Sequence, residues 1–247
     1  MSGDVPPRGG SPANTLPLLF MHLAAAIQGF MPFGPLLLAA AAAYLLGSLP
    51  TGFLVARARG IDIRAQGSGN IGATNVFRIL GIPAGIFVLL TDALKGAVAV
   101  LLVPTLVAQG FPGSDPVSLR MTCALGAVLG HNYTCWLRFK GGKGIATSAG
   151  ALAALVPEAF LITLGVFLLV LAVSRYVSLA SISGAAALPV AAWMTQAPRA
   201  VFWLSLLLAL LAIGKHHSNI RRLLAGTESR LGTRPHQPRP TNSDPIN

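Results

Sequence analysis

The stretch Gly67-Ser68-Gly69-Asn70-Ile71-Gly72, GSGNIG, decides between two folds because it has the G-x-G-x-x-G spacing of the dinucleotide-binding turn. That turn needs a strand before it and a helix after it within a βαβ unit. Here the flanks read RGIDIRAQ and ATNVFRILG, and long apolar segments lie beyond both. A soluble α/β sheet has nowhere to form around these flanks, so we predict an all-α membrane protein.

The composition also favours a membrane protein. The chain of 247 residues is 53% hydrophobic and only 10% charged, against roughly 25% charged residues in an ordinary soluble domain. Its 18 Lys and Arg against 7 Asp and Glu give a net charge of +11. In such a chain this excess points to anionic lipid headgroups or anionic substrates, and we expect no nucleic-acid partner.

Seven apolar runs are candidates for transmembrane helices, although several are shorter than the ~20 residues that span a bilayer. Breakers such as Gly60, Pro83 and Pro157 separate them. The sequence therefore predicts a polytopic membrane helix bundle of about seven transmembrane helices. The runs cover residues 35–56, 85–107, 119–137, 145–156, 158–173, 177–194 and 200–214.

The positions of Lys and Arg predict the orientation, because these residues gather on the cytoplasmic side of membrane proteins. With the segments assigned alternately, one side holds 14 cations and the other holds only Arg8, Arg120 and Arg199. We therefore expect the N-terminus outside and the C-terminus in the cytoplasm. The remaining cation, Lys95, falls inside a span, where Asp92 can pair with it and lower the cost of burying both charges. The pair either lines the site or only braces the fold, and we favour bracing.

GSGNIG then lies in a cytoplasmic segment, residues 60–83, that is too polar to span the membrane and too rich in Gly and Asn for an ordinary helix. Irregular backbone at membrane depth occurs only where it is buried in protein or lines a wet cavity. Apolar residues such as Ile63 and Phe77 favour a packed segment, and a flexible solvated loop is the alternative. The polar candidates here are Ser68, Asn70, Thr74, Asn75 and Arg78.

A second polar cluster, Phe139-Lys140-Gly141-Gly142-Lys143-Gly144, opens the fourth apolar run. Consecutive Gly amides, a helix N-terminus and two lysines are typical of an anion cradle, most often for phosphate. The cluster is not a Walker A loop, because Gly144 stands where Ser or Thr would bind magnesium. The alternative is a basic turn that follows the positive-inside rule, which explains the lysines but not the three glycines.

A third polar cluster reads KHHSNIRR from Lys215. His216 and Asn219 are three residues apart and share a helix face. Taken alone, the histidine is a polar anchor at the interface, and the arginines are lipid-headgroup contacts. The three clusters together are rich in donors and cations and poor in carboxylates, which predicts a site for two anionic groups on one or two substrates.

Seven segments of the chain carry a resemblance to a known family. They are GSLPTG (47–52), GSGNIGATNVFRILG (67–81), DALKG (92–96), LGHNY (129–133), FKGGKGIATS (139–148), SLASI (178–182) and HHSNIRRLLAGTE (216–228). Together they resemble the bacterial acyl-phosphate:glycerol-3-phosphate acyltransferases of the PlsY type. The resemblance implies transfer of a fatty acyl group from acyl phosphate to the 1-hydroxyl of glycerol 3-phosphate, which makes lysophosphatidic acid without acyl-CoA, acyl carrier protein or a cofactor.

By motif position, the resemblance also implies the roles of individual residues. The implied catalytic residues are Ser68, His216 and Asn219, and the implied substrate-binding residues are Thr74, Arg78, Gly141, Gly142, Lys143 and Ser181. The two glycines and Lys143 would hold the phosphate of glycerol 3-phosphate. Glu228 would be a structural tie. The family's usual RHRENI reads KHHSNI here, and His216 is chosen over His217 because it stands three residues before Asn219. No metal is implied.

The chemistry of an acyl phosphate fits these residues. It is a mixed anhydride with a good leaving group, so positioning and charge neutralisation can supply most of the rate. The proton passes either to a phosphate oxygen, as substrate-assisted transfer, or to His216 as the alternative base. A membrane transporter of an anionic phosphorylated metabolite is the alternative, because broken helices with Gly loops also build binding sites. A transporter would favour an inverted repeat, and the sequence has no convincing one.

The chain divides into three expected parts. Residues 1–33 are an N-terminal extension, partly disordered, 34–228 are the membrane acyltransferase domain, and 229–247 are a basic disordered tail. The resemblance implies a multi-pass protein of the bacterial cell inner membrane with its active site facing the cytoplasm. The expected partners are glycerol 3-phosphate, long-chain acyl phosphate and membrane lipids.

Overall fold

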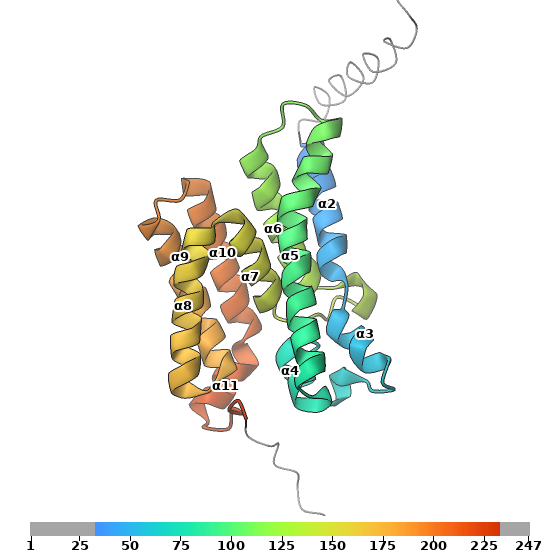
Figure 1. Cartoon of the computed structure of the whole chain (residues 1–247), viewed down its shortest axis with the longest axis vertical. Helices are drawn as coiled ribbons and strands as arrows, with labels where there is room; N and C mark the ends of the chain where they lie inside the picture. The colour runs from blue at the N-terminus through green and yellow to red at the C-terminus, as the bar shows by residue number, and fades with distance from the viewer. Residues whose placement is uncertain (1–32, 233–247) are drawn as a thin grey trace, which may run out of the picture.

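The computed structural model describes residues 33–232, and within this range every regular element is a helix. The all-α prediction is confirmed for this part of the chain, while nearly all of the predicted extension and tail lies outside it. Figure 1 shows the long helices running along the longest axis of the molecule. The elements, labelled as in Figure 1, are α2 (Gly34–Ser48), α3 (Thr51–Arg57), η2 (Ile63–Ala65), α4 (Ala73–Leu80), α5 (Ile82–Gly110), α6 (Pro116–Asn132), η3 (Cys135–Leu137), α7 (Ile145–Leu155), α8 (Pro157–Ser174), α9 (Val177–Met194), α10 (Arg199–Lys215) and α11 (His217–Leu224).

The seven predicted apolar runs fall on α2 with α3, and on α5 to α10. Four helical segments of the described chain are long and apolar enough to cross a membrane, and a fifth is added if the bent pair α10–α11 forms one span. The chain is therefore a multi-pass membrane protein. Helix α7 has 11 residues and α6 has 17, so the count of seven stays a prediction. The four segments are Gly34–Arg57, Ile82–Gly110, Pro157–Ser174 and Val177–Met194.

The first apolar run is broken where α2 ends and α3 begins. Leu49 adopts an extended conformation (φ −56°, ψ 114°) because it precedes Pro50. The Leu49 carbonyl oxygen accepts a hydrogen bond from Lys95 Nζ at 2.9 Å, and the same ammonium lies 2.8 Å from Asp92 Oδ1. The predicted Asp92–Lys95 pair is confirmed, and it also stabilises the break in the first span.

The segment 60–83 corrects one expectation, because it contains the helix α4. Gly72 is an extended residue before the helix, and Gly81 (φ 85°) ends it. Val76 of α4 packs in one core cluster with Ile63, Ile71 and the α5 residue Val88. Most of the Gly and Asn residues lie in the loop before α4, although Asn75 is inside the helix and Gly81 follows it. The apolar residues of the segment pack as predicted.

Small residues bring the helices of the bundle close together. A Cβ on Gly47 of α2 would lie 2.1 Å from the Ala127 carbonyl oxygen of α6, and a Cβ on Gly96 of α5 would lie 2.1 Å from the Thr147 carbonyl oxygen of α7. Such close backbone approach is the usual packing mode of membrane helices, where no hydrophobic force drives association. Helix α7 therefore sits directly on α5, and its N-terminus lies beside the end of α6.

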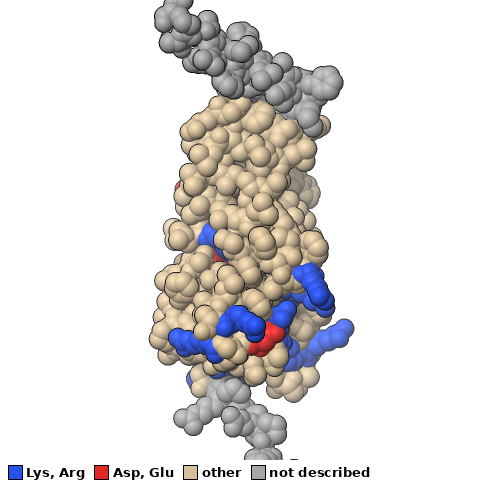
Figure 2. Space-filling model, turned by 90° about the vertical axis from the view of Figure 1, so that its right-hand side faces the viewer, with Lys and Arg blue, Asp and Glu red and all other residues tan. Residues whose placement is uncertain are grey.

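Charged side chains are unevenly distributed along the molecule. Figure 2 shows Lys and Arg gathered toward the lower end, which in Figure 1 is formed by α3, α4 and α11. The rest of the face in this view is almost entirely uncharged. This distribution is the one expected for a protein whose apolar band lies in lipid and whose basic end meets one leaflet.

Candidate functional site

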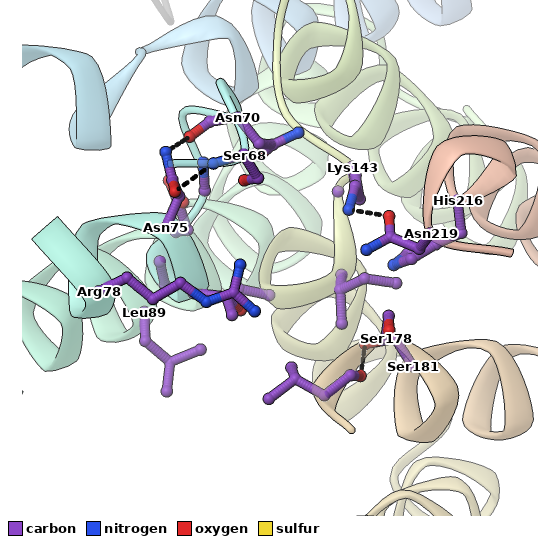
Figure 3. Close-up of a pocket in the computed structure, with 18 of the residues that line it drawn as sticks. Ser68, Asn70, Asn75, Arg78, Leu89, Lys143, Ser178, Ser181, His216 and Asn219 are labelled. Atoms are coloured by element: carbon purple, nitrogen blue, oxygen red, sulfur yellow. Dashed lines mark hydrogen bonds between the residues drawn. The ribbon is translucent and has the colours of Figure 1, made fainter. Parts of the chain in front are cut away.

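One side chain, that of Asn75 on α4, organises the GSGNIG loop. It is 1% exposed, and its amide nitrogen donates to the carbonyl oxygens of Ile63 (3.3 Å), Gln66 (3.0 Å) and Asn70 (2.9 Å). Its amide oxygen accepts a hydrogen bond from the Ser68 backbone at 3.0 Å. The loop is therefore held in one conformation, and Figure 3 shows Ser68 at the edge of a cavity that Arg78 also enters.

The glycines before Lys143 have a packing role that sequence reasoning did not anticipate. The Gly141 amide donates to the Asn132 carbonyl oxygen at 3.2 Å, and the Gly142 amide donates to that of His131 at 3.0 Å. A Cβ on Gly142 would lie 2.1 Å from His131 Nε2. The expectation that these two amides are free for a phosphate is wrong, because both donate hydrogen bonds to carbonyl oxygens at the C-terminal end of α6.

Lys143 is the residue that this loop presents to the cavity. Its ammonium donates to Asn219 Oδ1 on α11 (Figure 3). Gly144, Ile145 and Ala146, at the N-terminus of α7, line the cavity beside it. The helix N-terminus of the predicted cradle is thus present, since the first amides of a helix have no intrahelical partner.

The junction of α10 and α11 supplies the third polar cluster. The two helices meet at an angle of 58°, and His216 at the junction is 3% exposed. His216 Nδ1 lies 2.7 Å from the Ala212 carbonyl oxygen. A carbonyl can only accept, so Nδ1 carries the proton and a neutral His216 has Nε2 as an acceptor.

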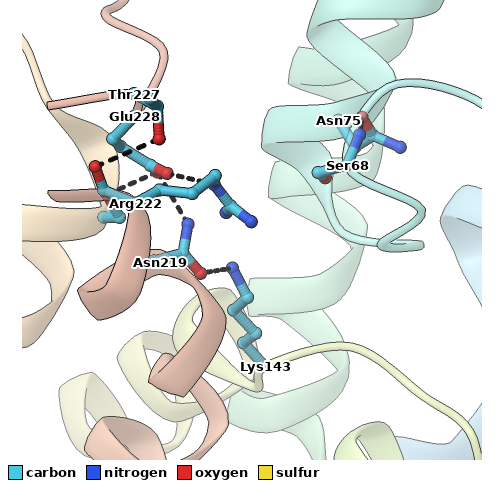
Figure 4. Close-up of polar contacts among 8 residues, drawn as sticks. Ser68, Asn75, Lys143, Asn219, Arg222, Thr227 and Glu228 are labelled. Carbon is cyan, nitrogen blue, oxygen red and sulfur yellow. Dashed lines mark hydrogen bonds and ion pairs between the residues drawn. The ribbon is translucent and has the colours of Figure 1, made fainter. Parts of the chain in front are cut away.

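Glu228, which is 8% exposed, ties this cluster together (Figure 4). Its Oε1 accepts hydrogen bonds from Ser178 Oγ and Asn219 Nδ2, both at 2.7 Å, and Arg222 Nε donates to its Oε2 at 2.6 Å. Burial alone would raise the pKa of Glu228, but these three hydrogen bonds outweigh it and lower the pKa. Glu228 is therefore an ionised carboxylate that fixes the orientation of Asn219.

Two half-buried cations, Arg78 and Lys143, lie on opposite sides of the cavity. Burial lowers the pKa of Lys143 to about 8, and the attraction of Glu228 is offset by repulsion from Arg222, Arg78 and Lys215. Burial also lowers the pKa of Arg78. An ammonium with so little carboxylate compensation is stabilised when a bound anion supplies the missing charge.

The cavity that these elements enclose has a volume of about 140 Å³. Seven of the predicted residues line it, whereas Gly141 and Gly142 do not. The seven are Ser68, Thr74, Arg78, Lys143, Ser181, His216 and Asn219. Sequence reasoning did not name His131 and Ser178 as lining residues, and it favoured bracing over lining for Asp92, which does line the cavity. A buried charge in a membrane span is the signal that could have placed Asp92 there.

A second cavity, of about 350 Å³, adjoins the first and is almost wholly apolar. It lies between α5, α7, α8, α9 and α10. The residues that line both cavities are Leu89, Ile145, Ala146, Phe167 and Ser181. A ligand with an anionic end and a hydrocarbon end can therefore occupy the two cavities at once.

Comparison with known proteins places this arrangement in a family. The family model for glycerol-3-phosphate acyltransferase matches residues 37–226. A glycerol-3-phosphate acyltransferase of Geobacter sulfurreducens is 48% identical over 195 residues, which are 79% of this chain and 97% of that protein. Another from Desulforamulus reducens is 49% identical over 191 residues, which are 77% of this chain and 92% of that protein.

Solved structures agree with the sequence relatives. Crystal structures of PlsY, an integral membrane glycerol 3-phosphate acyltransferase, match in a glycerol 3-phosphate form and a lysophosphatidic acid form, with TM-scores of 0.72 and 0.71. Both are 38% identical and cover 81% of this chain and 97% of that chain. The fold and the relatives define an integral membrane acyltransferase. This chain belongs to the glycerol-3-phosphate acyltransferase family.

Proposed function

We propose that the protein transfers a fatty acyl group from acyl phosphate to the 1-hydroxyl of glycerol 3-phosphate, giving lysophosphatidic acid and phosphate in the first step of bacterial phospholipid synthesis. The observation that carries the proposal is the junction of a cation-rich cavity with an apolar one at Ser181. The polar cavity offers a cation to each of two phosphorylated reactants, and the apolar cavity can take the hydrocarbon chain of one.

In this proposal each phosphate meets one of the two cations. Lys143 and the first amides of α7 hold the phosphate of glycerol 3-phosphate, because an ammonium beside a helix N-terminus is a site for a dianion. Arg78, with Ser68 and Thr74 nearby, holds the phosphate of the acyl donor. The two glycines act indirectly, by fixing the loop that carries Lys143 on the end of α6.

The acyl transfer needs one proton movement. The 1-hydroxyl oxygen attacks the acyl carbon, the bond from that carbon to the phosphate oxygen breaks, and the hydroxyl proton passes to the leaving phosphate. Asn219 and His216 orient the hydroxyl, since Glu228 fixes the first and the Ala212 carbonyl fixes the second. Positioning and charge neutralisation then supply the rate without an acyl-enzyme.

We further propose seven transmembrane helices across residues 34–228, an external N-terminus, and a site that faces the cytoplasm from the bacterial inner membrane. Support comes from the 14 to 3 division of cations in the sequence. The polar cavity also lies beside α4 and α11, at the basic end of the molecule. Glycerol 3-phosphate is a water-soluble metabolite, so a site at the cytoplasmic end receives it directly.

The decisive experiment measures phosphate release by the purified, detergent-solubilised protein given palmitoyl phosphate with and without glycerol 3-phosphate. We expect release to depend on glycerol 3-phosphate, lysophosphatidic acid to form, and palmitoyl-CoA to be inert as donor. Binding of glycerol 3-phosphate without turnover in a lipid-restored preparation would overturn the proposal. It would favour the transporter alternative, and uptake into liposomes would then test that alternative.

A further inference from the structure

The depth of the apolar cavity can be estimated separately from three of the helices that line it, α7, α8 and α9. Ser181 of α9 and Ile145 of α7 line both cavities, whereas Leu188 and Leu152 line only the apolar one. Each of these leucines stands seven residues further along its helix, on the same face. At a rise of 1.5 Å per residue, that spacing places them about 10 Å beyond the boundary between the cavities.

Helix α8 gives the same depth from the opposite chain direction, and α10 gives a consistent upper bound. On α8, Phe167 lines both cavities, and Phe160, seven residues earlier, lines only the apolar one. On α10, His216 lines the polar cavity, and Leu208, eight residues earlier, lines the apolar cavity. The α8 spacing corresponds to about 10 Å from the boundary, and the α10 spacing to about 12 Å from a residue of the polar cavity.

The far end of the apolar cavity is closed by the protein core. Leu152, Leu188 and Leu208 are 4%, 3% and 2% exposed and belong to one core cluster, against which Phe160 packs. At the side, by contrast, the cavity is bounded by Leu89 and Leu168, which are 43% and 53% exposed. The cavity is thus closed at its end and meets the lipid-facing surface at its side.

We propose that Leu152, Phe160, Leu188 and Leu208 form a floor that limits the enclosed part of the acyl chain and so determines chain-length specificity. The proposal rests on the proposed acyltransferase function. A C–C bond of 1.52 Å advances an extended chain by about 1.25 Å, so a depth of about 10 Å holds about eight carbon atoms. Longer chains leave sideways past Leu89 and Leu168 and lie in lipid.

The test measures kcat/KM for acyl phosphates of 6, 8, 10, 12 and 16 carbons. For each donor, the kcat/KM of a variant is divided by that of the wild type, so that partitioning of the donor into micelles cancels. In the wild type, kcat/KM rises about fourfold per methylene up to about eight carbons and then levels off. Leu188→Ala removes part of the floor and lengthens the apolar cavity. The ratio of kcat/KM for this variant to that of the wild type should therefore be about tenfold higher for donors of 10 or more carbons than for the six-carbon donor.

A second variant and a matched control keep the test independent of folding. Ala185→Leu places a larger side chain four residues past Ser181, so its ratio falls for chains longer than about five carbons. Leu204→Ala is the control, because Leu204 is buried in the same core cluster but does not line the cavity. Its ratio stays flat across chain lengths.

Flat ratios for both cavity variants, in preparations with wild-type-like Tm and activity on the six-carbon donor, would overturn the floor. Loss of activity with every donor in the wild type itself is a different result, and it would overturn the acyltransferase proposal instead. A ratio that depends on chain length only for Leu204→Ala would also overturn the proposal, because chain-length specificity would then depend on general core packing.

Discussion

The two walls of the polar cavity are built in different ways. The first wall, the GSGNIG loop with α4, is held by Asn75, whose hydrogen bonds reach no further than 12 residues along the chain. The second wall, formed by Lys143, α11 and Glu228, joins Lys143 to Asn219 across 76 residues and Ser178 to Glu228 across 50. Figure 4 shows the two walls facing each other.

This difference implies that the first wall contributes mainly to the stability of the fold and that Lys143 of the second wall contributes mainly to substrate binding. A buried amide whose hydrogen bonds are all made stabilises its loop, and removing it leaves carbonyl groups without partners. Lys143 is the opposite case, because its lowered pKa means that burial opposes its charge. We therefore expect changes in the first wall to reduce both stability and activity, and changes at Lys143 to reduce activity alone.

The largest effect is expected for Lys143→Met. Without the ammonium the phosphate of glycerol 3-phosphate loses a charge-assisted hydrogen bond in a half-buried site, and kcat/KM for glycerol 3-phosphate should fall about 100-fold. The Tm should stay the same or rise, because the variant no longer buries a charge that the fold disfavours. Steady-state kinetics and thermal unfolding in the same detergent measure both.

The matched control for this change is Lys140→Met, which removes an exposed lysine three residues away on the same loop. It should leave kcat/KM within about twofold of the wild type, because exposed charges contribute little. If the two variants lose the same activity, general attraction of the anion by the basic end explains binding, and the second wall has no special role.

An intermediate effect is expected for Asn75→Asp. The substitution keeps the shape of the side chain but turns its donor into an acceptor, so that three carbonyl oxygens face a carboxylate. The free energy of unfolding should fall by roughly 2–3 kcal/mol, and kcat should fall about 30-fold as Ser68 loses its position. Thermal unfolding and kcat at saturating substrates test the two parts.

Gln66→Ala is the control for Asn75→Asp, because Gln66 is an exposed side chain on the same loop. It should change neither quantity appreciably. A normal Tm for Asn75→Asp together with normal kcat would show that the loop does not depend on this amide, and the contrast between the walls would disappear.

The smallest effect is a pH dependence. With a pKa of about 8, against an ordinary value of 10.5, Lys143 loses its proton in the free enzyme as the pH rises through 8. Because the charged form binds phosphate, kcat/KM for glycerol 3-phosphate should fall roughly tenfold between pH 7 and pH 9. Over the same range stability contributed through Lys143 should rise, because the unfolded chain binds the proton more tightly.

Lys143→Arg separates this titration from others in the site, since a guanidinium stays charged throughout the range. Its kcat/KM should be lower than that of the wild type but nearly independent of pH up to 9. A wild-type profile that persists in Lys143→Arg would assign the titration to a different group.

The contrast between the walls also explains how much the sequence predicts. The apolar runs locate the helices because burial in lipid is a property of local composition, and the resemblance names seven residues that the fold does bring to one cavity. The free amides of Gly141 and Gly142 were a wrong expectation. A run of glycines predicts close backbone approach equally well, and only the position of α6 shows which groups approach.

Other features depended on the tertiary structure for the same reason. The hydrogen bond that stabilises the break at Leu49 comes from the distant Lys95, and the role of Ser178 required Glu228, which lies 50 residues away. The helix α4 was hidden by the Gly and Asn residues before it. The contacts of Leu49 and Ser178 are long-range pairings between polar groups, for which periodicity in the sequence carries no signal.

The five residues shared by the two cavities have a consequence for the end of the proposed reaction. Its products differ in solubility, because one is an inorganic ion and the other is an amphiphile. At this junction the ion diffuses to the aqueous side while the amphiphile is already positioned along its route into the bilayer. In the proposed reaction, each catalytic cycle therefore releases one product to water and the other to the bilayer. Partitioning of the amphiphile into the membrane removes it from the site and favours further turnover.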